Sequence, residues 1–166
     1  MVSGMNVREA MESDLPEIVN IYNASLGSGL ASTNTTPATV TRSKGWFRQH
    51  KATGRQIWVA EEGGRIVGWL SMRPFYRRPA YDATAKVMVY VAPESRGKGV
   101  GKRLLDNAIT CGPSAKINTL VCYLLSENER AKKLFEESGF KKWGTFPGVA
   151  NVAGIERDLV VLGLRL

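Results

Sequence analysis

The chain has 166 residues, of which 43% are hydrophobic, and its formal net charge is +8 because 23 Lys and Arg outnumber 15 Asp and Glu. This length and apolar content suit one ordinary hydrophobic core and are too small for two domains of typical size. We therefore expect a single domain over residues 7–166, preceded by a flexible tail at residues 1–6. The charge balance argues against intrinsic disorder and indicates an anionic partner: nucleic acid, a membrane surface or a phosphorylated cofactor.

Several classes of protein are excluded at this stage. No apolar run approaches the roughly 18 residues of a membrane-spanning helix, and the first residues lack the apolar segment of an export signal, so we expect a cytoplasmic protein without membrane contact. Cys111, Cys122 and the single histidine, His50, are too few for a tetrahedral zinc site or a disulfide framework, and no bound metal is expected. We interpret His50 as a helix-surface residue and Cys122 as a buried strand residue.

The hydrophobic pattern predicts alternating strands and helices, and with them an α/β (α+β) fold class. Asp14 stands where an N-cap is preferred, with Glu17 three residues later as in a capping box. Gly63-Gly64 separates two apolar segments at hairpin spacing, which favours antiparallel pairing. Residues 87–91 are apolar throughout, as is typical of a strand buried on both faces. The expected segments in chain order are a strand from residue 7, a helix at 15–22, a Ser- and Thr-rich loop at 24–41, a helix at 46–54, strands at 56–61, 65–72 and 87–91, a helix at 104–109, a strand at 118–125, a helix at 131–135 and a strand at 157–166.

The most informative segment is Arg96-Gly97-Lys98-Gly99-Val100-Gly101-Lys102-Arg103, between the strand at 87–91 and the next helix. Its glycines allow positive φ angles and close approach of the backbone to a ligand. Free amides at the start of the helix, its dipole and the nearby cations favour a phosphate or pyrophosphate. The spacing matches neither common nucleotide loop: a Rossmann fingerprint needs glycine where Lys102 stands, and a Walker A loop needs Gly and Ser or Thr where Arg96 and Arg103 stand.

What the spacing does match is Arg-x-x-Gly-x-Gly, at Arg96, Gly99 and Gly101, which resembles the pyrophosphate loop of the Gcn5-related N-acetyltransferases, the GNAT superfamily. Residues 127–140 resemble that family's second acetyl-CoA motif, Asn-x-x-Ala followed by an aromatic position and Gly-Phe. The resemblance implies a GNAT fold, a central mixed and mostly antiparallel sheet that is splayed at the acetyl-CoA site and flanked by helices. Within this family, the chain most resembles the phosphinothricin N-acetyltransferase branch, on the evidence of segments 18–23, 78–84, 90–91 and 146–148. The resemblance covers residues 7–162.

This resemblance implies an acetyl-CoA-dependent N-acetyltransferase in which the acceptor amine attacks the thioester directly. The branch acetylates small amino-acid-like amines, such as phosphinothricin or methionine sulfoximine, usually as a homodimer. A backbone amide of the strand at 89–91 is expected to stabilise the oxyanion that forms when the amine attacks the thioester, and we expect Val91 to be the donor. The residues expected to bind acetyl-CoA are Val89, Tyr90, Val91, Arg96, Gly97, Lys98, Gly99, Val100, Gly101 and Asn128.

Two positions depart from the family pattern. Lys86 occupies the place where the branch carries a Glu general base, and three interpretations stay open: a base whose pKa is lowered by burial beside Arg78, a cation that binds the carboxylate of the acceptor, or a surface lysine without a role. Phe135 stands where many relatives carry Tyr or His, and it has no proton to give the departing thiolate. Water, Tyr90 or Tyr123 are the alternative donors.

The acceptor pocket is expected between residues 73–81 and the loop at 25–36, with Phe75 and Tyr81 as apolar walls and Arg78 as a carboxylate clamp. Basic residues gather where an acidic acceptor would enter. Two other functions fit the sequence: a peptide or protein N-acetyltransferase with an open groove, and a non-catalytic acyl-CoA-binding regulator. Nucleic-acid binding has the least support, because the remaining basic residues are scattered and no helix-turn-helix or stacking motif is present.

Overall fold

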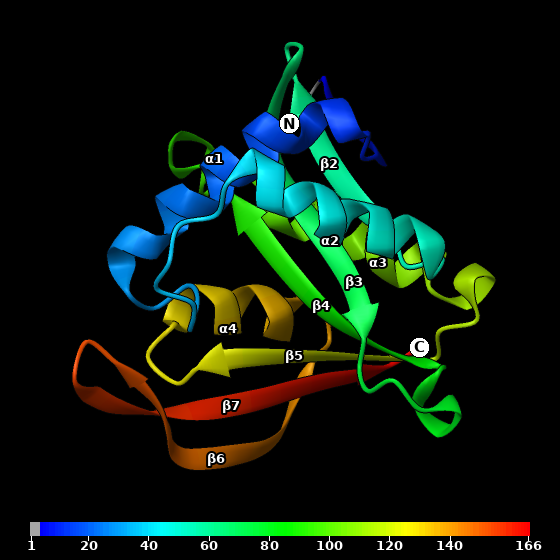
Figure 1. Ribbon diagram of the computed structural model, residues 1–166. Coiled ribbons are helices and arrows are strands. Elements are labelled where there is room, and N and C mark those ends of the chain that lie inside the picture. Colours follow the sequence, from blue (N-terminus) through cyan, green and yellow to red (C-terminus); the bar gives the residue numbers. More distant parts are fainter. Residues whose placement is uncertain (1–3) are drawn as a thin grey trace.

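The computed structural model describes residues 4–166, which form a seven-stranded sheet and four α-helices joined by short 3₁₀ turns (Figure 1). The strands are β1 (Met5–Glu9), β2 (Ile57–Glu62), β3 (Arg65–Pro74), β4 (Thr84–Val91), β5 (Thr119–Leu125), β6 (Lys141–Val152) and β7 (Ile155–Arg165). The helices are α1 (Leu15–Ser25), α2 (Val40–Ala52), α3 (Val100–Cys111) and α4 (Glu129–Glu137).

The sheet has the strand order β1-β2-β3-β4-β5-β7-β6. Neighbouring strands are antiparallel except β4 and β5, which are parallel. The hairpin through Gly63-Gly64 joins β2 and β3 as predicted. β4 and β5 pair over only three residues on each strand and then diverge, which is visible as a wedge at the centre of Figure 1. The predicted mixed, mostly antiparallel sheet with a splay is confirmed.

Helices cover both faces of the sheet, and each face has its own core. On one face, α3 and α4 pack with Leu104, Leu105 and Phe135 against β3, β4 and β5. On the other face, α1 and α2 pack against Trp69 and Tyr90. β4 contributes to both cores, so the prediction of a strand buried on both faces is confirmed. Each fully buried Leu contributes about 1.5–3 kcal/mol, and these two layers hold the strands that border the splay.

Several element boundaries differ from the sequence prediction, and one strand was not predicted at all. β1 begins at Met5, so Met5 and Asn6 pair with β2 instead of belonging to the tail, whose residues 1–3 lie outside the described part. α2 begins at Val40 and not near residue 46, because the Thr39 hydroxyl caps it by accepting from the amide of Arg42 at 3.3 Å. β6 was not predicted, because its exposed residues show no alternation of apolar and polar side chains.

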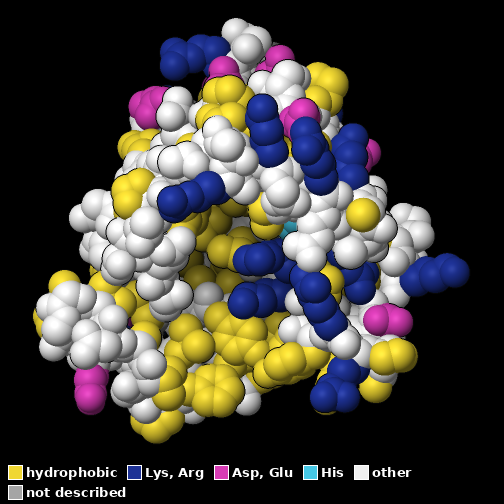
Figure 2. Space-filling view, in the orientation of Figure 1, with side chains coloured by type: hydrophobic (Ala, Val, Ile, Leu, Met, Phe, Trp, Pro, Cys, Tyr) yellow, Lys and Arg dark blue, Asp and Glu magenta, His cyan; other side chains and the backbone are white. Residues whose placement is uncertain are grey.

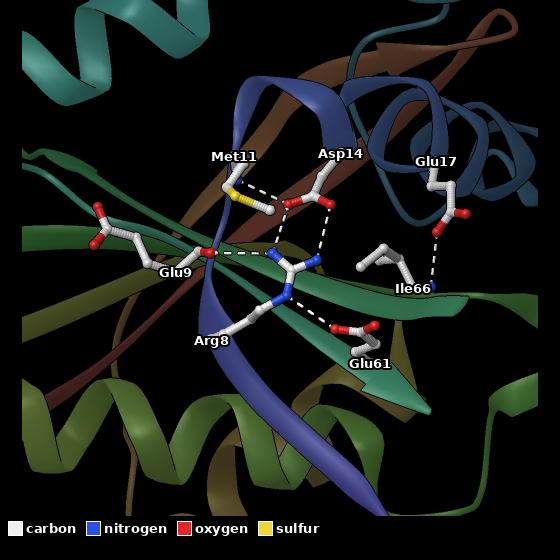
Figure 3. Close-up of polar contacts among 7 residues, drawn as sticks. All are labelled: Arg8, Glu9, Met11, Asp14, Glu17, Glu61 and Ile66. Carbon is white, nitrogen blue, oxygen red and sulfur yellow. Dashed lines mark hydrogen bonds and ion pairs between the residues drawn. The ribbon is translucent and has the colours of Figure 1, made fainter. Parts of the chain in front are cut away.

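A polar network joins β1, β2 and the start of α1 (Figure 3). The Arg8 guanidinium donates to both carboxylate oxygens of Asp14, at 2.8 and 2.9 Å, and to Glu61 at 2.9 Å. Asp14 precedes α1 as expected, but its side chain makes no cap hydrogen bond and accepts from the amide of Met11. Glu17 accepts from the amide of Ile66 on β3 at 2.7 Å, so the expected capping box is replaced by tertiary contacts.

With 13 residues, α2 is the longest helix in residues 4–166, and none of these helices is long and apolar enough to cross a membrane.

Candidate active site

The opening between β4 and β5 exposes one edge of β4, and this edge begins the candidate site. The amide of Ala92, directly after β4, donates to the carbonyl of Val67 on β3 at 2.9 Å. Because backbone groups alternate between the two edges of a strand, the even-numbered residues of β4 face β3. The amide of Tyr90 therefore faces β3, while the amides of Val89 and Val91 face the opening. These two amides are the ones that can stabilise an oxyanion there.

The glycines of the loop between β4 and α3 have different structural roles. Gly97 and Gly99 have left-handed φ angles of 73° and 83°, which only glycine adopts readily. A Cβ at Gly97 would meet no atom within 4 Å, so the loop is open to a ligand on that side. A Cβ at Gly101 would lie 2.9 Å from Cδ2 of Leu134, so this glycine allows α3 and α4 to pack closely.

The start of α3 is suited to an anion. The amide of Arg103 donates to the carbonyl of Gly99 at 3.0 Å, and the amides of residues 100–102, in the first turn, have no intrahelical acceptor. Arg96 holds the loop against β4, because its Nε donates to the carbonyl of Val91 at 3.3 Å. Amides, helix dipole and the Arg96 guanidinium together form a cradle that fits a pyrophosphate.

A cavity of about 600 Å³ lies between β4, β5, α4 and residues 30–33 of the loop before α2. Figure 2 shows a central hollow with a mostly hydrophobic floor and Lys and Arg side chains gathered on one side, beneath α2. Of the predicted site residues, the cavity brings together Phe75, Lys86, Val89, Tyr90 and Asn128.

Asn128 connects α4 to the loop that borders this cavity. Its Oδ1 accepts from the amide of Ala131 at 3.2 Å and so caps α4. Its Nδ2 donates to the carbonyl of Leu30 at 3.3 Å, across 98 residues of sequence. Leu30 itself lines the cavity. The predicted pantetheine residue is therefore in the cavity, and its amide also ties down the loop.

Lys86 lies at the point where β4 and β5 separate. Its Nζ is 5.0 Å from the centre of the Tyr123 ring on β5, a cation–π distance. Burial lowers the pKa of Lys86, and the positive charge of Arg73 lowers it further. The cationic neighbour is thus Arg73, and not Arg78 as expected. A lysine that is half-buried among cavity residues is also not a surface lysine without contacts.

Comparison with known proteins shows the family to which this chain belongs. Residues 15–140 match the acetyltransferase (GNAT) family. The chain belongs to this family. It is 40% identical, over 98% of its length and 99% of the relative, to YwnH of Bacillus subtilis, provisionally named a phosphinothricin acetyltransferase. It is 30% identical, over 97% and 94%, to the L-methionine sulfoximine/L-methionine sulfone acetyltransferase of Pseudomonas aeruginosa. Among solved structures, the phosphinothricin acetyltransferase of Sinorhizobium meliloti in complex with acetyl-CoA superposes with a TM-score of 0.92 at 25% identity, over 98% and 88% of the two chains.

The protein is accordingly a GNAT acetyltransferase with acetyl-CoA as its cosubstrate, and the predicted family resemblance is confirmed. Its own residues fit this molecule. The loop at 96–101 offers amides and a guanidinium for the pyrophosphate, and the gap between β4 and β5 leaves room for the pantetheine arm beside Asn128. Bound acetyl-CoA supplies an activated acetyl thioester, and the chain supplies its orientation.

The groups that could exchange protons in the GNAT cavity are few. Phe135 is 2% exposed and packs edge-to-face on Phe140, and its ring has no dissociable proton. Burial raises the pKa of the Cys122 thiol, so this free cysteine stays protonated and is a poor nucleophile. Its position agrees with the prediction of a buried strand residue. Burial also raises the pKa of Tyr90, which therefore keeps its hydroxyl proton as a hydrogen-bond donor.

The residues expected to bind the acceptor are only partly brought together. Phe75 lines the large cavity and stacks edge-to-face on Tyr76 and Tyr81, with ring centres 4.5 and 5.7 Å away. Tyr81 supports this cluster from outside and does not line the cavity. Arg78, the expected carboxylate clamp, also lies outside the cavity lining.

A second cavity, of about 340 Å³, lies at the carboxyl end of α2 and was not predicted from the sequence. It is lined by His50, which is 6% exposed and not on the surface as expected. The signal for this burial was the position of His50 three residues after the buried Phe47, on the same face of α2. Burial and the charge of Arg73 lower the pKa of His50 to about 4, so the imidazole is neutral at physiological pH.

Within residues 4–166, no group of three or more His, Cys, Asp or Glu side chains is placed to hold a metal ion.

Proposed function

We propose that this acetyltransferase transfers the acetyl group of acetyl-CoA to the amine of a small amino-acid-like acceptor, of the phosphinothricin or methionine sulfoximine type. The observation that carries the proposal is the large cavity, which joins the free edge of β4 to Lys86 and to the loop at residues 30–33. The names of the two relatives that align over nearly the whole chain support this acceptor class.

In this proposal, each part of the site has a separate role. The loop at 96–101 holds the pyrophosphate, and Asn128 with the edge of β4 holds the pantetheine arm. The amides of Val89 and Val91 point into the opening, where a negative charge develops on the thioester oxygen as the amine attacks. A backbone donor already in position costs no reorganisation at that moment.

The acceptor must attack as a neutral amine, although a free ammonium is mostly protonated at neutral pH. Neither cavity has Asp or Glu in its lining, so a carboxylate base is not at hand. Lys86 and Arg73 instead surround the acceptor with positive charge, which disfavours the ammonium form and lowers the pKa of the amine. The proton released before attack passes to water. The second proton, which the nitrogen loses as the amide forms, passes through water to the departing CoA thiolate, so the products are the amide, CoA thiol and one proton. In this proposal Lys86 assists through its charge and needs no deprotonation of its own.

The test is an acetylation assay with acetyl-CoA and phosphinothricin, methionine sulfoximine, a panel of free amino acids and short peptides. We expect an acetyl mass shift on a small acceptor together with release of CoA. Gly99→Val should abolish turnover, because its φ of 83° is closed to valine. Gly45→Val, at an exposed position of α2 where a side chain meets open space, is the matched control. Acetylation of peptides alone would replace the proposal by a peptide acetyltransferase.

A second candidate is an acyl-CoA-binding regulator without turnover. One observation favours it: Lys86 and Phe135 occupy the two positions at which the family transfers protons. Calorimetry with acetyl-CoA and CoA separates the two functions. Binding without product from any acceptor would establish the regulator, and product formation would eliminate it.

We also propose that the protein is a cytoplasmic homodimer and that residues 7–166 of each copy form a single domain. A surface for a second copy is offered by β6 and β7, where large apolar side chains are 49–60% exposed. Light scattering of the purified protein, compared with a double Trp143→Ser, Val149→Ser variant, tests the dimer. The exposed residues on these strands are Trp143, Phe146, Val149 and Ile155.

A further inference from the structure

Within residues 4–166, Lys86 carries the only amino group in the lining of either cavity. It pairs with Val121 in the last pair that β4 and β5 form before the two strands diverge (Figure 1). Its side chain leans toward β5, because Nζ lies 5.0 Å from the centre of the Tyr123 ring. The amine of Lys86 therefore stands at the base of the opening in which the proposed function places the thioester.

The stem of Lys86 is long enough to reach an acyl group at the free edge of β4. Val89 is three residues further along β4, about 10 Å away in an extended strand. The flexible four-carbon stem of a lysine covers roughly 6 Å of this distance. Since a thioester oxygen that accepts from the Val89 amide lies about 3 Å from it, Nζ can approach the carbonyl carbon to within roughly 4 Å, close to the separation from which an amine attacks.

Lys86 also lacks the acidic partner that keeps other lysines of this chain protonated. Lys102, Lys132 and Lys133 each form an ion pair with a carboxylate on their own helix. No ion pair within residues 4–166 includes Lys86. Because burial and the charge of Arg73 lower its pKa, Lys86 holds more neutral amine at physiological pH than an exposed lysine does. The neutral amine is the form that acts as a nucleophile.

We propose that Lys86 is itself an acetyl acceptor, so that the enzyme acetylates its own Nζ when acetyl-CoA is bound and no acceptor amine is present. In this step the lone pair of Nζ forms a C–N bond with the thioester carbonyl carbon, and the C–S bond breaks. The nitrogen loses one proton, which passes through water to the departing thiolate, so the products are Nζ-acetyl-lysine and CoA thiol. This inference rests on the part of the proposed function that places the thioester at the edge of β4, and it is independent of the acceptor class.

Acetylation of Lys86 would change the cavity in two ways. It removes the positive charge that the proposed function assigns to this side chain, and it places a neutral acyl group where the acceptor amine approaches. Both changes slow transfer to an external amine. An acceptor already in the cavity competes with Lys86 for the same acyl group, so the enzyme is protected while its substrate is present.

The first experiment incubates the purified protein with acetyl-CoA, without an acceptor, and follows each lysine by peptide mass spectrometry. We expect an acetyl group on Lys86 at least about tenfold faster than on Lys44, an exposed lysine of α2 outside both cavities. In Gly99→Val, with its cofactor loop distorted, the rate at Lys86 should fall to that at Lys44. Lys86→Arg keeps the charge and should stay unmodified at this position. Equal rates at Lys86 and Lys44 in the native protein would overturn the proposal.

The second experiment involves no transfer from acetyl-CoA. Acetic anhydride labels neutral amines, and bound CoA should slow its reaction with Lys86 severalfold while leaving Lys44 unchanged. Reaction of Lys86 that is insensitive to saturating CoA would also overturn the proposal. If Lys86 is acetylated by acetyl-CoA and no small acceptor is, self-acetylation stands and the proposed function falls. If small acceptors are acetylated while Lys86 stays unmodified in their absence, the proposed function stands and self-acetylation falls.

Discussion

Arg73 on β3 and Lys86 on β4 are direct cross-strand partners in the antiparallel pair. Opposite residues of such a pair share one face of the sheet, so two positive side chains leave it side by side and enter the same cavity. Like charges in this arrangement destabilise a sheet by about 0.2–1 kcal/mol. In the proposed function, this unfavourable pair supplies the positive charge that acts on the acceptor.

The pH dependence of turnover is the first prediction. In Lys86→Met, the acceptor ammonium loses a positive neighbour and its pKa rises, so the rising limb of the kcat profile should move to higher pH by about one unit. Lys44→Met, which removes an equal charge from the exposed surface of α2, should leave the profile in place. Initial rates at saturating acceptor across neutral to alkaline pH measure this. Loss of activity at every pH would show that Lys86 is instead the base.

The glycines of the site give a second prediction. Gly101→Ala has the same helical backbone gain as Gly45→Ala, but it forces a Cβ to 2.9 Å from Cδ2 of Leu134, which must shift, so its free energy of unfolding should be about 1 kcal/mol lower than that of Gly45→Ala. Gly45→Ala has open space and a helical backbone, so it should raise the free energy of unfolding by about 0.5–1 kcal/mol. Urea unfolding of both variants measures the difference. Equal effects would mean that close packing of α3 on α4 does not explain Gly101.

The network of Arg8 and Asp14 gives a third prediction. Burial raises the pKa of Asp14, but hydrogen bonds from Arg8 and from the amide of Met11, with the charge of Arg8, outweigh it and leave that pKa lowered. A carboxyl group with a lowered folded-state pKa stabilises the protein fully above its unfolded pKa, and this contribution is lost as the pH falls through the folded value.

Asp14→Asn should therefore lower the free energy of unfolding by about 2 kcal/mol at neutral pH, as hydrogen bonds to a charged group require. The difference from the native protein should shrink below about pH 4. Glu12→Gln is the control, because the ion pair of Glu12 with Arg48 is exposed and should contribute less than about 1 kcal/mol. A difference for Asp14→Asn that does not change with pH would contradict the role of its charge.

Asn128 gives a fourth prediction, in which two variants separate its two hydrogen bonds. Asn128→Asp keeps an oxygen that caps α4 but loses the Nδ2 donor to Leu30, so stability should be preserved while amide exchange in residues 26–39 becomes faster. Asn128→Ala loses both and should also cost about 1 kcal/mol of unfolding free energy. Hydrogen exchange by mass spectrometry reads out the loop. Unchanged exchange in Asn128→Asp would show that the contact with Leu30 does not hold it.

Local patterns in the sequence were sufficient for the framework of the site. The glycine loop between β4 and α3 and the hairpin at Gly63-Gly64 each depend on a few neighbouring residues, and backbone sterics or hydrogen bonding within one turn decide them. The family motifs follow the same local spacing. For this reason the acetyl-CoA cradle and the fold class were predictable.

Tertiary structure alone decided the features that depend on contacts between distant segments. The register of β3 on β4 placed Arg73, and not Arg78, beside Lys86. The packing of α2 buried His50, and the pairing with β7 made a strand of β6 although its side chains are exposed. Register and packing are set by the summed energy of a whole interface, which is not encoded in the spacing of any short segment. The sequence by itself determined the glycine loop proposed to hold acetyl-CoA, and the assembly of β3, β4 and α2 determined the charged cavity.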